Sequence, residues 1–111
     1  MIIESKVHDK IVVLYPKGRL DFTLSMSFEK ALGQIVNNHP DKHILLDLND
    51  LEYLNSSSLR VVTVLAQSLR GKNLKLFACQ MKGIVKRVME ITNIIELIEI
   101  VESEEQAMKS L

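Results

Sequence analysis

The sequence predicts an α/β fold: a single domain with a mixed, mainly parallel β-sheet, an N-terminal hairpin and four helices. Short apolar runs of strand length alternate with segments in which apolar residues recur every three or four positions, the spacing of one helical face. Repeated strand–helix–strand units of this kind favour parallel pairing with helices packed on the sheet. The expected order is β-β-α-β-α-β-α-β-α. The domain is expected to occupy residues 1–111, because a chain of this length builds one core.

The hairpin comes from the first two expected strands. Residues 2–7 suit an edge strand, because Glu4 and Lys6 are charged and tolerate solvent. Ile11–Tyr15 is a continuous apolar run, typical of a central strand, and His8-Asp9 makes a tight turn between the two. The chain should therefore fold back on itself at once.

The first helix is expected from Thr23 to the polar residues 37–40, because the apolar spacing between them is helical. Its predicted apolar face consists of Leu24, Phe28, Ala31, Leu32 and Ile35. Residues 44–48 then form another buried strand.

The second helix is expected after Asn55, and Gly71 ends it in the usual C-terminal position. Its predicted buried stripe consists of Leu59, Val62, Leu65, Ala66 and Leu69. The opposite, polar stripe consists of Ser56, Arg60, Thr63, Gln67 and Arg70.

The remaining elements follow the same alternation. Residues 74–78 and 98–101 are expected strands, and a capping box at residues 103–106 opens a C-terminal helix. Between those strands, a third helix is predicted with an apolar face of Ile84, Val85, Val88 and Ile91.

Composition excludes several classes of function. Lys+Arg and Asp+Glu both total 14, so the chain lacks the basic excess typical of nucleic-acid binding. Its apolar runs are too short to cross a membrane, and no secretion signal is evident. Cys79 is the only cysteine, which predicts a small core residue and no disulfide. We therefore expect a cytoplasmic protein with neither nucleic-acid nor membrane partners.

The polar run Asn55-Ser56-Ser57-Ser58 stands where a buried strand gives way to a helix. Catalysis by a serine there needs a base, but His8, His39 and His43 are expected at the opposite end of the sheet. The chain also lacks a Gly-x-Ser-x-Gly elbow, a glycine-rich phosphate loop and a metal-ligand cluster. We therefore expect no enzymatic activity, cofactor or metal.

The remaining roles for this polar run are those of residues at the start of a helix, namely capping and anion binding. Asn55 or Ser56 suits the N-cap, but capping does not account for four polar residues in a row. A helix start presents free N–H groups and a positive dipole end, so a serine in its first turn can carry a phosphate. Residues 18–21 follow another strand and should lie close to this run.

These residues resemble the STAS domains of bacterial anti-sigma-factor antagonists over essentially the whole chain. The resemblance rests on Gly18-Arg19-Leu20-Asp21, on residues 44–54, on Asn55-Ser56-Ser57-Ser58-Leu59, on residues 86–93 and on the C-terminal helix around Ala107. Each motif is loose, whereas their order and spacing over a full domain are specific.

The resemblance implies a non-enzymatic regulator. In the family, a serine at the position of Ser56 is phosphorylated by an anti-sigma factor that is also a serine kinase, and a serine phosphatase removes the phosphate. The unphosphorylated antagonist binds the anti-sigma factor and frees the sigma factor. The family also has an aspartate close to the phosphorylated loop, in a Gly-x-Leu/Ile-Asp motif. Asp21 matches that aspartate.

The chain departs from the family loop at three positions. Asn55 stands where aspartate is usual, Ser58 where glycine is usual, and Arg60 where a small residue is common. The hypothesis is a partner-switching antagonist with Ser56, rather than Ser57 or Ser58, as the switch. Its partner-binding residues are predicted to be Asp21, Asn55, Ser56, Ser57, Arg60, Thr63 and Gln67. The alternative is a constitutive, unphosphorylated STAS module in another signalling or transport complex, which the altered loop favours.

Overall fold

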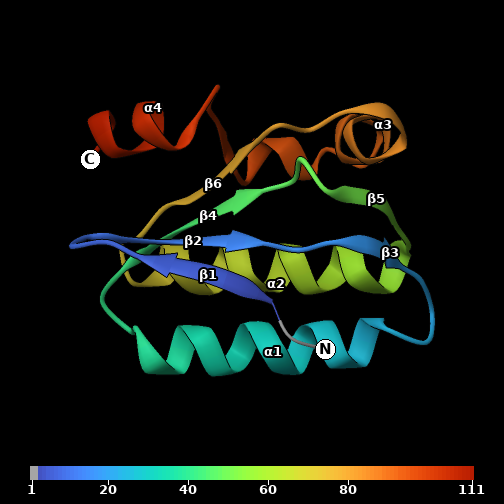
Figure 1. Cartoon of the computed structure of the whole chain (residues 1–111), viewed down its shortest axis with the longest axis horizontal. Helices are drawn as coiled ribbons and strands as arrows, with labels where there is room; N and C mark the ends of the chain where they lie inside the picture. The colour runs from blue at the N-terminus through green and yellow to red at the C-terminus, as the bar shows by residue number, and fades with distance from the viewer. Residues whose placement is uncertain (1–2) are drawn as a thin grey trace.

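The sheet of the computed structural model, which describes residues 3–111, has five strands in the order β1-β2-β4-β6-β7 (Figure 1). β1 (Glu4–Val7) runs antiparallel to β2 (Ile11–Tyr15). β2, β4 (His43–Asp47), β6 (Leu76–Cys79) and β7 (Glu99–Ile100) pair in parallel. The mixed, mainly parallel sheet with its opening hairpin is therefore confirmed. Residue 2, the start of the first expected strand, lies outside the described residues.

Helices cover the two faces of this sheet unequally. α1 (Ser25–Asn38) and α2 (Ser56–Gly71) lie side by side on one face and run in the same direction (Figure 1). The short α4 (Glu104–Lys109) lies on the opposite face, and α3 (Gly83–Ile91) packs near the end where β5 lies. None of the helices in residues 3–111 is long and apolar enough to cross a membrane.

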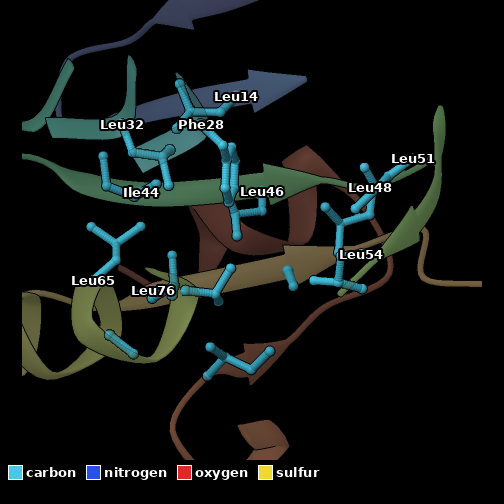
Figure 2. Close-up of a cluster of buried hydrophobic side chains, with 14 of the residues drawn as sticks. Leu14, Phe28, Leu32, Ile44, Leu46, Leu48, Leu51, Leu54, Leu65 and Leu76 are labelled. Carbon is cyan, nitrogen blue, oxygen red and sulfur yellow. The ribbon is translucent and has the colours of Figure 1, made fainter. Parts of the chain in front are cut away.

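The main core lies between the sheet and the α1–α2 layer. Successive side chains of a strand point to opposite faces, so Val12 and Leu14 of β2 face this layer while Ile11 and Val13 face α4. Figure 2 shows the core side chains that it labels: Leu14, Phe28, Leu32, Ile44, Leu46, Leu48, Leu51, Leu54, Leu65 and Leu76. The predicted buried stripe of α2 is confirmed in full, because Leu59, Val62, Leu65, Ala66 and Leu69 are all buried.

A second, small sheet was not predicted. β3 (Gly18–Leu20) and β5 (Leu51–Leu54) pair in parallel, with Leu20 opposite Leu54. Both segments were expected to be loops, because three or four residues are too few to display a period. This small sheet holds together the two loops that precede α1 and α2. A short 3-10 helix at Ile94–Glu96 was also not predicted.

The structure corrects the predicted faces of two helices. In α3, Val85 and Met89 are buried, whereas Ile84 and Ile91 are exposed. At about 100° of rotation per residue, both exposed isoleucines lie roughly a third of a turn from Val85. α1 begins at Ser25 rather than at Thr23, with Leu24 partly exposed at its N-cap.

Strand ends differ from the prediction as well. β6 begins at Leu76 instead of residue 74, and β7 has two residues instead of residues 98–101. Ile98 and Val101 are buried beside β7 without extending its ladder. The apolar residues of this segment therefore predicted which side chains are buried, but not which residues belong to the strand.

Candidate functional site

The site is built around the first turn of α2. Asn55 has an extended backbone, with φ −92° and ψ 180°, and its side-chain oxygen accepts a hydrogen bond from the Ser58 backbone N–H at 2.9 Å. This is the geometry of an N-cap, and an amide oxygen serves it as well as a carboxylate does. The predicted capping by Asn55 is confirmed, so the loop keeps its shape without the negative charge of an aspartate.

The three serines of this turn occupy different environments. Ser56 and Ser57 are exposed, whereas Ser58 is completely buried and its hydroxyl donates to the Leu20 carbonyl at 3.4 Å. Ser58 is therefore inaccessible to an enzyme. Ser57 was expected to lie toward the packed side and the rim, because the helical period rotates it and Ser58 away from the stripe of Ser56 and Arg60. It remains exposed because a recess between α1 and α2 opens beside it.

Asp21 directly follows β3 and organises the turn before α1. Its carboxylate accepts hydrogen bonds from the Thr23 hydroxyl at 2.7 Å and from the Thr23 backbone N–H at 3.1 Å. The Thr23 hydroxyl is the main reason why the pKa of Asp21 lies below its ordinary value, and nearby Arg19 adds to this effect. Asp21 is therefore an anion at neutral pH.

Hydrogen bonds join the Asp21 loop to the serine loop. The Asn55 backbone N–H donates to the Leu20 carbonyl at 3.0 Å, the same oxygen that accepts from Ser58. The Gly18 N–H donates to the Asp50 carbonyl at 2.9 Å, and the positive φ of Gly18 (77°) favours glycine there. The predicted proximity of residues 18–21 to the serines is confirmed.

The polar stripe of α2 continues the surface away from the serines. Arg60 and Gln67 are exposed, and Arg60 forms no salt bridge within residues 3–111. Thr63 is half-buried, and its hydroxyl already donates to the Leu59 carbonyl at 3.0 Å. Thr63 can therefore offer a partner its methyl group more readily than its hydroxyl.

Three features next to this surface were not predicted from the sequence. The Arg19 guanidinium lies 4.6 Å from the centre of the Tyr53 ring, a cation–π contact on the small sheet. Phe22, in the turn before α1, and Met26, in the first turn of α1, are exposed although both are large and apolar. The only signal in the sequence was that Phe22 directly follows Asp21.

Side chains suited to a metal ion do not cluster in the part of the chain that the structure describes. Residues 3–111 contain no cluster of three or more His, Cys, Asp or Glu side chains suited to a metal ion. Cys79 is buried in the core as predicted, and burial raises the pKa of its thiol to about 12. The chemistry that this surface offers is that of binding and of accepting a group on a hydroxyl.

The comparisons with known proteins identify the family. The STAS domain family matches residues 3–107, and the chain belongs to it. The anti-sigma F factor antagonist of Paenibacillus polymyxa is 22% identical over 109 residues, which are 98% of this chain and 93% of that protein. BtrV of Bordetella bronchiseptica is 34% identical over 67 residues, 60% of this chain, and the match spans 58% of BtrV.

Solved structures share the fold. The Thermotoga maritima protein TM1081 has a TM-score of 0.87 and 26% identity, covering 97% of this chain and 92% of its own. The Bacillus cell fate determinant SpoIIAA, in its phosphorylated form, has a TM-score of 0.72 and 14% identity, covering 97% of both chains. The chain is therefore a STAS domain whose relatives over nearly full length are anti-sigma-factor antagonists.

Proposed function

We propose that this chain is a non-enzymatic anti-sigma-factor antagonist that binds a kinase-type anti-sigma factor and is switched by phosphorylation of Ser56. The observation that carries the proposal is an exposed serine in the first turn of a capped helix, beside the Asp21 loop. Membership of the STAS family and the antagonist relatives support the same role.

Phosphorylation at Ser56 suits the local physics. A phosphate adds about −1.5 to −2 charges at neutral pH, and the positive end of a helix dipole stabilises that charge. Arg60 lies four residues further along α2, one turn away, where a cation supports the phosphate. The fold should therefore tolerate the modification.

The same modification should end partner binding. We infer that the anti-sigma factor contacts the Asp21 loop, Asn55 to Ser57 and the exposed face of α2 with Arg60, Thr63 and Gln67. Phosphate at Ser56 would place bulk and negative charge at the centre of that surface, beside the loop that carries the anionic Asp21. A partner fitted to the unmodified hydroxyl loses its contacts there. A serine phosphatase would restore them.

The test uses a purified anti-sigma factor with a kinase domain, encoded nearest to the gene for this chain. After incubation with ATP, phosphopeptide mass spectrometry should find the label on Ser56, and Ser56→Ala should abolish it. Ser57→Ala, which changes the neighbouring exposed hydroxyl, is the matched control and should keep the label. Label on Ser57 alone would move the switch by one residue.

Binding measured by calorimetry completes the test. Ser56→Asp should weaken the complex by at least tenfold, and Ser56→Ala should bind as the wild type does. The double substitution of Arg60 and Gln67 by glutamate should weaken binding without lowering the melting temperature. Unchanged affinity of that double variant would place the interface elsewhere.

The second candidate function is a constitutive STAS interaction module in another signalling or transport complex. It is favoured by one observation, the neutral Asn55 in place of the acidic residue usual in the family loop. Binding without any incorporation of phosphate, at Ser56 or elsewhere, would select this candidate.

A further inference from the structure

Two large apolar side chains, one in the turn before α1 and one in its first turn, are mostly solvent-exposed. Phe22 is 82% exposed and Met26 is 80% exposed, and both line a recess of about 400 Å³. Ser57, Arg60 and Val61 of α2 form the other wall of this recess. Isolated exposed apolar residues are common, but two that share a hollow form a patch of the kind that marks an interaction site.

The recess continues as a groove between the two helices. A second hollow of about 230 Å³ lies further along α1 and α2, and its apolar lining includes Leu32, Val36, Val61, Val64 and Leu65. Glu29 and Val61 line both hollows, so the two adjoin along the helix pair. Because α1 and α2 run in the same direction (Figure 1), the groove leads from the serine loop along the helix pair.

Gly33 opens this groove on the α1 side. It lies in the interior of α1 and is exposed, and a Cβ atom placed on it would meet no other atom within 4 Å. Glycine destabilises a helix interior relative to alanine, so internal packing does not account for it. An absent side chain does let the backbone or side chain of another molecule approach the helix closely.

The rim of the groove carries charges of both signs. Glu29 stands where the two hollows meet and Arg60 stands at the serine end, and neither forms a salt bridge within residues 3–111. An apolar channel with such a rim is complementary to an amphipathic helix that presents apolar residues one turn apart and charged residues on its flanks.

We propose that the groove between α1 and α2 receives an amphipathic helix of the anti-sigma factor, with Phe22 and Met26 as apolar anchors at its mouth. The proposal rests on the proposed function and extends its surface. The occupant is assigned to the anti-sigma factor because Ser57 and Arg60 belong both to the mouth of the groove and to the predicted switch surface. A helix seated there with a basic residue opposite Glu29 and an acidic residue opposite Arg60 lies against Ser57, next to Ser56. Phosphorylation then displaces it.

The test blocks the groove without disturbing the core. Gly33→Glu places a charged side chain in the groove, and the matched control Gln34→Glu adds the same charge at the next position of α1, outside the lining. Titrated calorimetrically with the purified kinase-type anti-sigma factor used above, Gly33→Glu should weaken binding at least tenfold. Gln34→Glu should stay within twofold of the wild type. Neither melting temperature should fall, since both positions are exposed.

A second variant removes the anchors instead of blocking the groove. The double substitution Phe22→Ala and Met26→Ala should also weaken binding at least tenfold, because aromatic anchors dominate interfaces of this kind. If both groove variants bind with wild-type affinity while Ser56→Asp binds weakly, the groove proposal is wrong and the proposed function stands. Failure of the wild type to bind would overturn the proposed function together with the groove. A dimer of this chain that Gly33→Glu disrupts, in sedimentation without the anti-sigma factor, would make a second copy the occupant and overturn the assignment.

Discussion

The face of the sheet that carries α2 is covered by two long helices, whereas the opposite face is covered by the six-residue α4. Between the sheet and the α1–α2 layer lies the larger of the two apolar clusters. On the α4 face a small cluster that includes Phe77 and Ala107 is supplemented by a polar contact, in which the Tyr15 hydroxyl donates to the Glu104 carboxylate at 2.8 Å. The serine loop therefore belongs to the face of the sheet that has the larger core.

The largest expected effect is therefore on the α2 face. Leu65→Ala removes a side chain that is 7% exposed, and the cavity left behind should lower the free energy of unfolding by about 2–5 kcal/mol. Urea titration followed by circular dichroism measures the loss. Val64→Ala is the control on the same turn, because Val64 is 51% exposed and should lose far less. Equal losses at the two positions would mean that the core does not lie where the structure places it.

A smaller effect is expected on the α4 face. Tyr15→Phe removes the hydroxyl that donates to Glu104, which should cost about 1 kcal/mol and loosen α4 from the sheet. Hydrogen exchange of the α4 backbone amides should become faster while that of α2 stays unchanged. Tyr53→Phe is the control, because the Tyr53 hydroxyl forms no hydrogen bond within residues 3–111. Unchanged α4 exchange in Tyr15→Phe would show that apolar contacts alone hold this helix.

The smallest effect comes from alkaline pH and originates on the same face. Burial, together with the hydrogen bond to Glu104, raises the pKa of Tyr15 above its ordinary value, and burial raises the pKa of Cys79 to about 12. Both groups ionise more readily in the unfolded chain, so their contribution to stability is complete below their ordinary pKa values and is lost as pH rises. Unfolding at pH 9 should be easier than at pH 7 by less than about 1 kcal/mol.

The double variant Tyr15→Phe and Cys79→Ala tests whether these two side chains cause the loss of stability at alkaline pH. Its free energy of unfolding should change less between pH 7 and pH 9 than that of the wild type. An undiminished pH dependence would assign the alkaline sensitivity to other groups.

The parts of the fold that were predictable are those in which burial repeats with a clear period. β2 and β4 are apolar runs because both of their faces are covered, and α2 buries every residue of its predicted stripe. β3 and β5 were missed because their few residues show no period, and their pairing depends on segments far apart in the chain. Ile91 was wrongly predicted to be buried, because helical spacing shows which side chains share a face of the helix but not which face points to the core.

The site divides in the same way. Capping by Asn55 follows from local chemistry, and the proximity of Asp21 follows from the topology of parallel strands, so both were predictable. The burial of Ser58 against Leu20 and the groove beside Phe22 arise only when distant segments meet. No local pattern in the sequence encodes them.

The Leu20 carbonyl has a mechanical consequence. Because it accepts hydrogen bonds from both the Asn55 backbone and the Ser58 hydroxyl, the C-terminal end of β3 is joined to the first turn of α2. The pairing of Leu20 with Leu54 in the small sheet adds a second connection between the two loops. We therefore expect the two loops to move together rather than independently.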